Sequence, residues 1–191
     1  NDRQLQQKFA AEASVYLSAA HELSPVLALR YGVRLNQFNR LAQSGLERYA
    51  NDQPITYNNT LGIYQEATPI GTYSKEESTA SFTNIEPRFT LAYRTQKSAW
   101  KASYQRVHQY LHLISNTASP TPLDVWTTSG KYLKPQRADQ WAVGYATERD
   151  NGNSFEVESF YKITQNRYDY IDSAELVANE ALERILMAGK G

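Results

Sequence analysis

Between Leu27 and Leu35 the side chains alternate strictly in type, and few folds tolerate such a pattern. Every odd position in this segment is large and apolar, while every even position is small or charged. Successive side chains of a β-strand point to opposite faces, so the pattern gives one apolar face and one polar face. A helix would instead scatter Arg30 and Arg34 among the leucines. The segment is therefore predicted to be a strand.

Five further segments show the same alternation. Their apolar positions are Phe9, Ala11, Ala13, Val15, Leu17 and Ala19; Ile85, Phe89, Leu91 and Tyr93; Trp100, Ala102 and Tyr104; Trp141, Val143 and Tyr145; and Phe155, Val157 and Tyr161. Only Phe160 interrupts the last of these patterns. The chain is therefore expected to be all-β, with about six strands in one antiparallel, up-and-down sheet.

The predicted strands are long. Lys8 to His21, Val26 to Phe38, Thr83 to Thr95 and Ala99 to His112 can each run for about a dozen residues, whereas strands of soluble proteins usually hold about 5 to 6. A tilted strand needs about 9 to 11 residues to cross the hydrocarbon layer of a membrane. Strand length therefore favours a membrane-spanning sheet.

The predicted connections alternate between short and long. The short turns are Glu22–Pro25, Gln96–Ser98 and Arg149–Asn153, and the long connections run over about 39–82, 113–135 and 172–191. All tight turns then lie at one end of the sheet and all long loops at the other. This asymmetry, together with long alternating strands, is typical of a transmembrane β-barrel of the outer membrane, with apolar side chains facing lipid. Six strands are fewer than the roughly eight of the smallest usual barrel, so we expect a curved, open arc of a larger one.

Composition excludes several other classes. The chain has no cysteine, which removes disulfides, cysteine-based zinc sites and thiol catalysis. Its 20 basic and 20 acidic residues balance, so no electrostatic feature predicts a nucleic-acid partner. The main alternative is a soluble all-β binding module, such as a carbohydrate-binding β-sandwich or a lipocalin-like barrel, because burial of one face against a second sheet produces the same alternation.

Several stretches in a fixed order resemble the TonB-dependent receptors of outer membranes, in particular the subgroup with a carboxypeptidase-regulatory-like domain before the plug. They are Phe82–Phe89, Lys101–Arg106, Gln109–Asn116, Ser119–Trp126, Lys134–Gln136 with Ala138–Gln140, and Glu156–Glu158 with Phe160–Lys162. The resemblance covers most of the chain from about Ala13 onward, and it is most specific between Tyr104 and Tyr145.

The resemblance implies a large barrel that is plugged by a separate domain and imports a nutrient or metal complex by energy-coupled uptake. Residues 1–191 are then expected to be a fragment of one barrel domain, with the plug and the remaining strands elsewhere in the protein. The implied partners are outer-membrane lipid, the plug domain, the TonB energy-coupling complex and a surface lipoprotein. The implied localisation is the outer membrane, and no enzymatic activity is expected.

Charged residues gather on the predicted polar face. In a barrel they would line the lumen and form ion pairs across strands and with the plug, whereas in a soluble sheet they would be an ordinary solvated face. These residues are Arg30, Arg34, Glu86, Arg88, Lys101, Glu156 and Glu158.

Ligand contact is expected in the external loops, at Asn116, Asp124, Trp126 and Tyr132, which combine aromatic rings with hydrogen-bonding groups. The alternative is that these aromatic rings pack one loop against another.

No catalytic residues, metal ligands or cofactor are predicted. His108 and His112 would lie about 13 Å apart along one strand, too far to share an ion. Residues 174–186 carry apolar side chains at helical spacing, so a short helix in an external loop is expected there.

Overall fold

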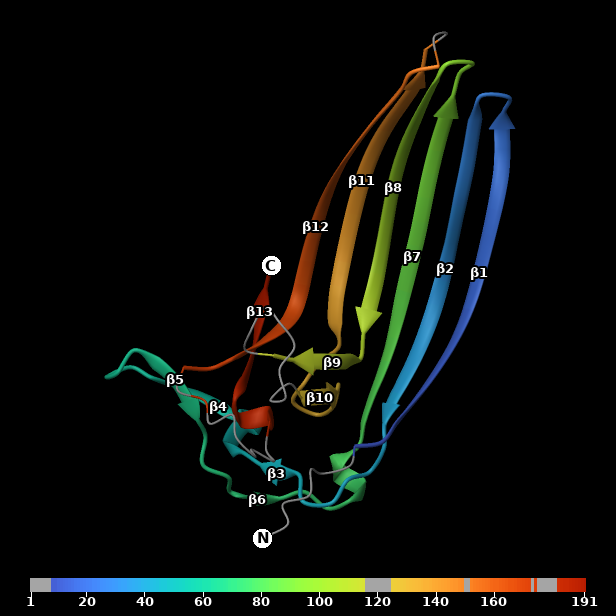
Figure 1. Cartoon of the computed structure of the whole chain (residues 1–191). Helices are drawn as coiled ribbons and strands as arrows, with labels where there is room; N and C mark the ends of the chain where they lie inside the picture. The colour runs from blue at the N-terminus through green and yellow to red at the C-terminus, as the bar shows by residue number, and fades with distance from the viewer. Residues whose placement is uncertain (1–7, 116–124, 150–151, 173, 175–181) are drawn as a thin grey trace.

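A large antiparallel sheet organises the chain. The computed structural model describes residues 8–115, 125–149, 152–172, 174 and 182–191. Seven strands form this sheet in the order β1-β2-β7-β8-β11-β12-β13 (Figure 1). Their bounds are Ala10–Ser24 (β1), Leu27–Arg40 (β2), Ala80–Arg94 (β7), Ser98–Gln109 (β8), Gln136–Glu148 (β11), Ser154–Tyr170 (β12) and Leu186–Lys190 (β13). The all-β prediction and the six strands predicted from alternation are confirmed, and the short β13 is an addition.

The register of the sheet converts alternation along each strand into two continuous faces. Tyr31 lies opposite Phe89, Phe89 opposite Tyr104, Tyr104 opposite Trp141, and Trp141 opposite Tyr161. Aromatic side chains thus form one row across five strands, and the other apolar positions fall into parallel rows on the same face. A slip of one residue in any strand would turn its apolar side chains to the opposite face, so the patterned sequence itself fixes this register.

Tight turns and long connections lie at opposite ends of the sheet (Figure 1). β1 and β2 are joined through Pro25 and Val26, and the β7–β8 turn is closed by a 2.7 Å hydrogen bond from Thr95 N–H to the carbonyl of Ser98. The connections β2–β7, β8–β11 and β12–β13 all lie at the other end. The predicted asymmetry of the connections is confirmed.

The long connections are folded together rather than irregular. The first, expected to be irregular, contains β3 (Glu47–Arg48), β4 (Ile55–Asn58), β5 (Ile63–Glu66), β6 (Gly71–Thr72) and the 3-10 turns Ala50–Asp52 and Glu76–Ser78. The second contains the hairpin of β9 (Leu111–Ile114) and β10 (Val125–Thr128). Apolar side chains from the second and third connections and the adjoining strand ends share one buried core, formed by Ile114, Leu133, Ile171, Leu182, Ile185 and Leu186. We call the packed connections the loop assembly.

The helix expected within residues 174–186 is not present in the described part of that segment. Leu182–Arg184 forms a single 3-10 turn, and Leu186 already begins β13, where it pairs with Tyr170 of β12. The carbonyl of Ile185 accepts a 2.9 Å hydrogen bond from the N–H of Ile171, so the backbone here is already engaged with the end of β12. Residues 175–181 lie outside the described residues.

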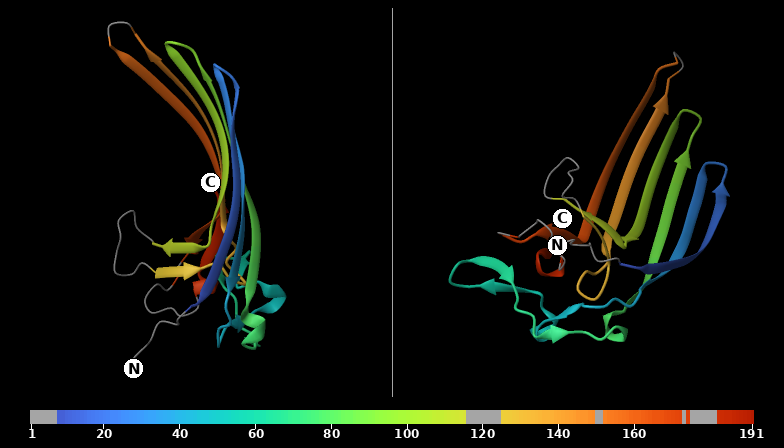
Figure 2. Two further views of the ribbon diagram at one scale, coloured as in Figure 1. Left: turned by 90° about the vertical axis from the view of Figure 1, so that its right-hand side faces the viewer. Right: turned by 60° about the horizontal axis from the view of Figure 1, so that its bottom comes forward.

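The long strands form a single layer with two open edges. Figure 2 shows no second sheet of described strands laid over either face of the long strands. Among the described residues, no strand pairs with the outer edge of β1, and β13 meets β12 only from Gln165 onward. The sheet is therefore not closed.

Candidate functional site

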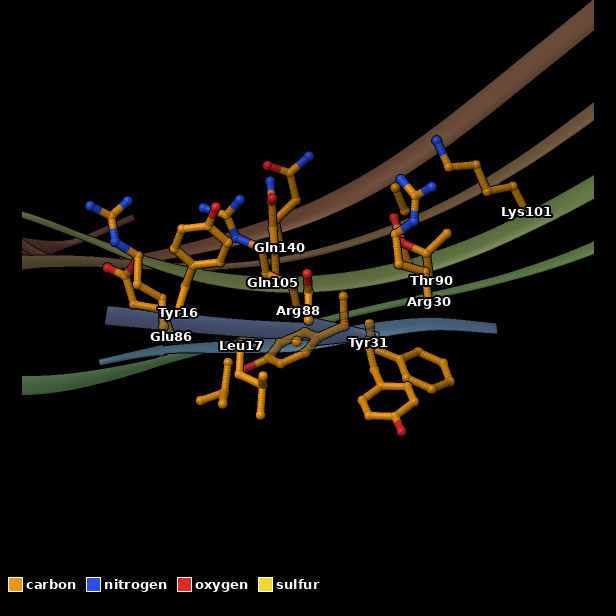
Figure 3. A pocket seen from close by; sticks show the side chains of 18 of the residues that line it. Tyr16, Leu17, Arg30, Tyr31, Glu86, Arg88, Thr90, Lys101, Gln105 and Gln140 are labelled. Atoms are coloured by element: carbon orange, nitrogen blue, oxygen red, sulfur yellow. The ribbon is translucent and has the colours of Figure 1, made fainter. Parts of the chain in front are cut away.

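The polar face of the sheet is its concave face. Figure 3 shows Arg30, Arg88 and Lys101 standing on one side of the strands while Leu17 and Tyr31 point to the other, and the sheet bends toward the polar side. The register explains this grouping, since Arg88 lies opposite Gly32, between Arg30 and Arg34 along β2. The apolar positions consequently occupy the convex face.

A trough of about 630 Å³ runs along the concave face. Six of the seven charged residues predicted on the polar face line it, namely Arg30, Arg34, Glu86, Arg88, Lys101 and Glu158. Glu156, the seventh, lines an adjoining hollow together with Lys101 and Glu158. The volume of the trough lies within the range of about 300–1,000 Å³ that is usual for small-molecule sites.

The ion pairs expected across the strands of this face do not form among the described residues. Arg34 lies directly opposite Glu86, yet its Nη2 donates a 2.8 Å hydrogen bond to Oγ of Ser14 instead. Glu86 is engaged elsewhere, because its Oε1 accepts a 2.6 Å hydrogen bond from the backbone N–H of His108 and lies 3.3 Å from Nδ1 of that residue. This carboxylate is 3% exposed, and its hydrogen-bond partner is His108 and not an arginine.

The chain beyond β8 folds inward over the loop end of the concave face. Tyr110 stacks on Phe38 with ring centroids 4.6 Å apart and planes 3° from parallel. Its hydroxyl accepts a 2.9 Å hydrogen bond from Nδ2 of Asn84. Phe38 and Asn84 occupy positions of the polar face, so these contacts cover that face near the loop end of β2 and β7.

The predicted ligand residues of the loops take different positions. Trp126 is 62% exposed on β10, opposite Leu113. Tyr132 packs inside the loop assembly, where its hydroxyl donates a 3.1 Å hydrogen bond to the carbonyl of Glu47 and its ring meets Tyr49 edge-on at 5.4 Å. Burial raises the pKa of both tyrosines. Asn116 and Asp124 lie outside the described residues.

The convex face carries a charged cluster that was not predicted from the sequence. Asp139 accepts 2.7 Å hydrogen bonds from the hydroxyl of Tyr104 and from Nε of Arg106, and its other oxygen lies 3.0 Å from Nε of Arg137. The cluster begins where apolar alternation ends on β8 and β11. A network of Gln37, Asn39, Ser81 and Thr83 on β2 and β7 likewise follows their last apolar positions. These two groups of residues form a polar rim along the sheet. The points at which the alternation of apolar and polar residues stops could have predicted this rim from the sequence.

The histidines offer no metal site among the described residues. His108 belongs to β8 and His112 to β9, and no three His, Asp or Glu side chains gather closely enough there to hold an ion. His112 is 3% exposed, with Nε2 at 3.0 Å from Oγ of Ser129. Burial lowers the pKa of this imidazole.

Within the described ranges, every helical turn is too short and too polar to cross a bilayer. Comparisons with family models, curated proteins and solved structures gave no match to the chain.

Proposed function

We propose that residues 1–191 form an arc in the wall of a transmembrane β-barrel in the outer membrane, belonging to a TonB-dependent receptor that imports a nutrient or metal complex. The observation that carries this proposal is the distribution of side chains on a curved sheet. Polar and charged groups occupy the concave face, and apolar groups occupy the convex face. A barrel surrounded by lipid has this arrangement.

Soluble all-β proteins have the opposite arrangement. In a sandwich or a small soluble barrel, apolar side chains face a shared interior and polar ones face water. Here the apolar face is exposed across six strands, at Val15, Leu17, Tyr31, Val33, Leu35, Ile85, Phe89, Tyr93, Trp100, Trp141, Val143, Phe155, Val157 and Tyr161. Complete transfer of a Val, Leu, Ile or Phe side chain out of water contributes about 1.5 to 3 kcal/mol, so in this proposal hydrocarbon is the solvent that stabilises this face.

Strand length and backbone pairing agree with a membrane setting. The six long strands hold 12 to 17 residues, more than the roughly 9 to 11 that a tilted membrane strand requires. Lipid offers no hydrogen bonds to backbone groups, so the open edges of β1 and β12 need further strands. In this proposal the rest of the protein supplies them and closes the barrel.

Energy-coupled uptake is the part of the proposal that rests on the sequence resemblance. The concave face would meet the plug domain and the transported solute, while the plug would connect the barrel to the TonB complex. The loop assembly would face the exterior. Its exposed Trp126 supplies a stacking surface for an incoming ligand, and its outer surface offers a place for a lipoprotein partner.

Single cysteines at four positions of β2, two on each face, test the membrane placement. The 191 residues contain no cysteine, so positions 30, 31, 33 and 34 can each carry one nitroxide label. In the protein folded into lipid vesicles, labels at 31 and 33 should be relaxed by oxygen dissolved in the lipid. Labels at 30 and 34 should respond to a water-soluble nickel complex instead. Equal access of the nickel complex to all four positions contradicts the proposal.

Cell fractionation tests the same proposal without any label. The protein that contains these residues should be recovered with the outer membrane, and its electrophoretic mobility should change on heating, because a closed barrel resists unfolding in detergent. Recovery as a soluble monomer without detergent supports the alternative of a soluble binding module.

A further inference from the structure

Three arginines surround a glycine on the concave face. Arg88 on β7 lies opposite Gly32 on β2, and Arg30 and Arg34 stand two residues to either side of that glycine (Figure 3). Side chains on such diagonal positions of neighbouring strands are about 7–8 Å apart, within reach of long arginine side chains. We call Arg30, Arg34 and Arg88 the arginine triad.

Gly32 lies between these arginines and is one of the residues that line the trough. A Cβ at this position would lie 2.9 Å from the carbonyl oxygen of Leu17 and 3.0 Å from Cβ of Ser18 on β1. The close approach of β1 therefore requires glycine.

The positive charge of the triad is not balanced within the described part of the chain. The side chains of Arg30 and Arg88 form no hydrogen bond or ion pair there, and the side chain of Arg34 is bound only to the neutral Ser14. Glu86 is held by His108, while Glu158 lies across Gly144 from Lys101, on strands remote from β2. Glu22 is diagonal to Arg30 but forms no ion pair with it.

The lining of the trough carries four basic residues, Arg30, Arg34, Arg88 and Lys101, against two acidic ones, Glu86 and Glu158. Neighbouring like charges on a sheet repel one another, and a concave surface with an excess of one sign of charge concentrates ions of the opposite sign. Repulsion between the arginine side chains therefore raises the free energy of the empty trough, and a bound anion would lower it. Guanidinium groups match carboxylate and phosphate oxygens through paired hydrogen bonds. The rest of the lining supplies neutral hydrogen-bonding groups from Thr90, Ser103, Gln105 and Gln140.

We propose that the arginine triad is a binding site for the oxyanion, carboxylate or phosphate, of a small hydrophilic solute held in the trough. This inference adds a ligand class to the proposed function. It depends only on the concave face, so it can be tested separately from the membrane placement.

Calorimetric titration of the complete detergent-purified protein tests the site, with citrate and inorganic phosphate as probes in a buffer of low ionic strength. At least one probe should bind saturably, and Arg88→Gln should weaken its binding tenfold or more. Arg94→Gln is the matched control, since Arg94 belongs to the same face of β7 but lies near the turn end. The control should change the affinity less than twofold. Arg30→Gln provides a second test of the triad, and an unchanged far-ultraviolet circular dichroism spectrum verifies that each variant is folded.

Three results overturn the proposal. Absence of binding to the natural protein refutes the site, and an equal loss of affinity in Arg94→Gln shows attraction by diffuse charge alone. Absence of binding together with a lower thermal midpoint in Arg88→Gln, but not in Arg94→Gln, identifies an acidic side chain of the same protein as the occupant. None of these results changes the outcome of cell fractionation, so failure of this site and failure of the membrane proposal are distinguishable.

Discussion

Leu29 and Ser103 lie on opposite faces of the sheet, so arginine at each position should have a different effect. Leu29 faces Leu91 on the convex side, whereas Ser103 lines the trough. Arginine that faces the middle of a bilayer costs about 2 to 4 kcal/mol. Leu29→Arg should therefore lower the free energy of unfolding, by an amount that approaches this value with the depth of the side chain in the bilayer, and Ser103→Arg should lower it by less than about 1 kcal/mol. Denaturant unfolding of the protein in lipid vesicles measures both, and equal losses would contradict the assignment of the two faces.

His112 should make the loop assembly sensitive to acid. Because burial lowers its pKa in the folded state, the unfolded chain takes up a proton first as the pH falls through the ordinary value of about 6.5. Stability is then lost below that pH, and the loss continues down to the folded-state pKa. Hydrogen exchange of β9 amides should therefore be faster at pH 5.5 than at pH 7.5 after correction for intrinsic rates.

Two substitutions check the assignment of this acid sensitivity. His112→Asn should largely remove the difference between the two pH values. His21→Asn, at an exposed histidine near the turn end, should leave it unchanged. Acid sensitivity that survives in His112→Asn would place its origin in another group.

Single residues could be assigned to a face from the sequence, but their partners could not. Arg30, Arg34 and Arg88 all occupy even-numbered positions. They are predicted to share a face, because apolar and polar residues alternate without interruption in these parts of β2 and β7. The register places Arg34 opposite Glu86, yet Glu86 is bound to His108. The position of that histidine depends on the path of β8, and no local pattern encodes that path.

Among the elements, the loop assembly has an apolar core of its own. Ile185 is 0% exposed at its centre. Replacement of a buried isoleucine by alanine usually costs about 2 to 5 kcal/mol. Ile185→Ala should therefore increase cleavage of the loop assembly by protease added from outside, while the long strands remain protected. Ile70→Ala, at a 63% exposed position, is the control and should change cleavage little. Equal cleavage of the two variants would show that this core does not hold the connections together.

Long strands were predictable because alternation over a dozen positions is hard to produce in any other way. The short strands were not, since β3 and β6 hold two residues each and cannot display a period. The expected helix was misleading for a related reason. Leu182, Ile185 and Leu186 have helical spacing, but they are apolar because they enter the shared core through a 3-10 turn and the first residue of β13.

For the whole molecule, the sequence predicted an open arc, and the structure shows an open sheet whose concave face is polar. The curvature itself was not deducible from alternation, because a strand pattern states which side chains share a face but not toward which face the sheet bends. That direction separates a membrane wall from a soluble half-barrel. The direction in which the sheet bends is a property of all the long strands packed together, so it cannot be deduced from the pattern of any one strand.

The 191 residues expressed alone should depend on detergent. Their apolar convex face and the unpaired backbone groups along β1 both favour association in water. Analytical ultracentrifugation should therefore detect large aggregates in plain buffer and a smaller, detergent-bound species in micelles. A variant with Leu17→Glu, Val33→Lys and Phe89→Gln on the convex face should stay soluble to a greater extent without detergent. A stable monomer of the unmodified chain in plain buffer would contradict the membrane-wall proposal. It would show that the apolar convex face can remain in water without association.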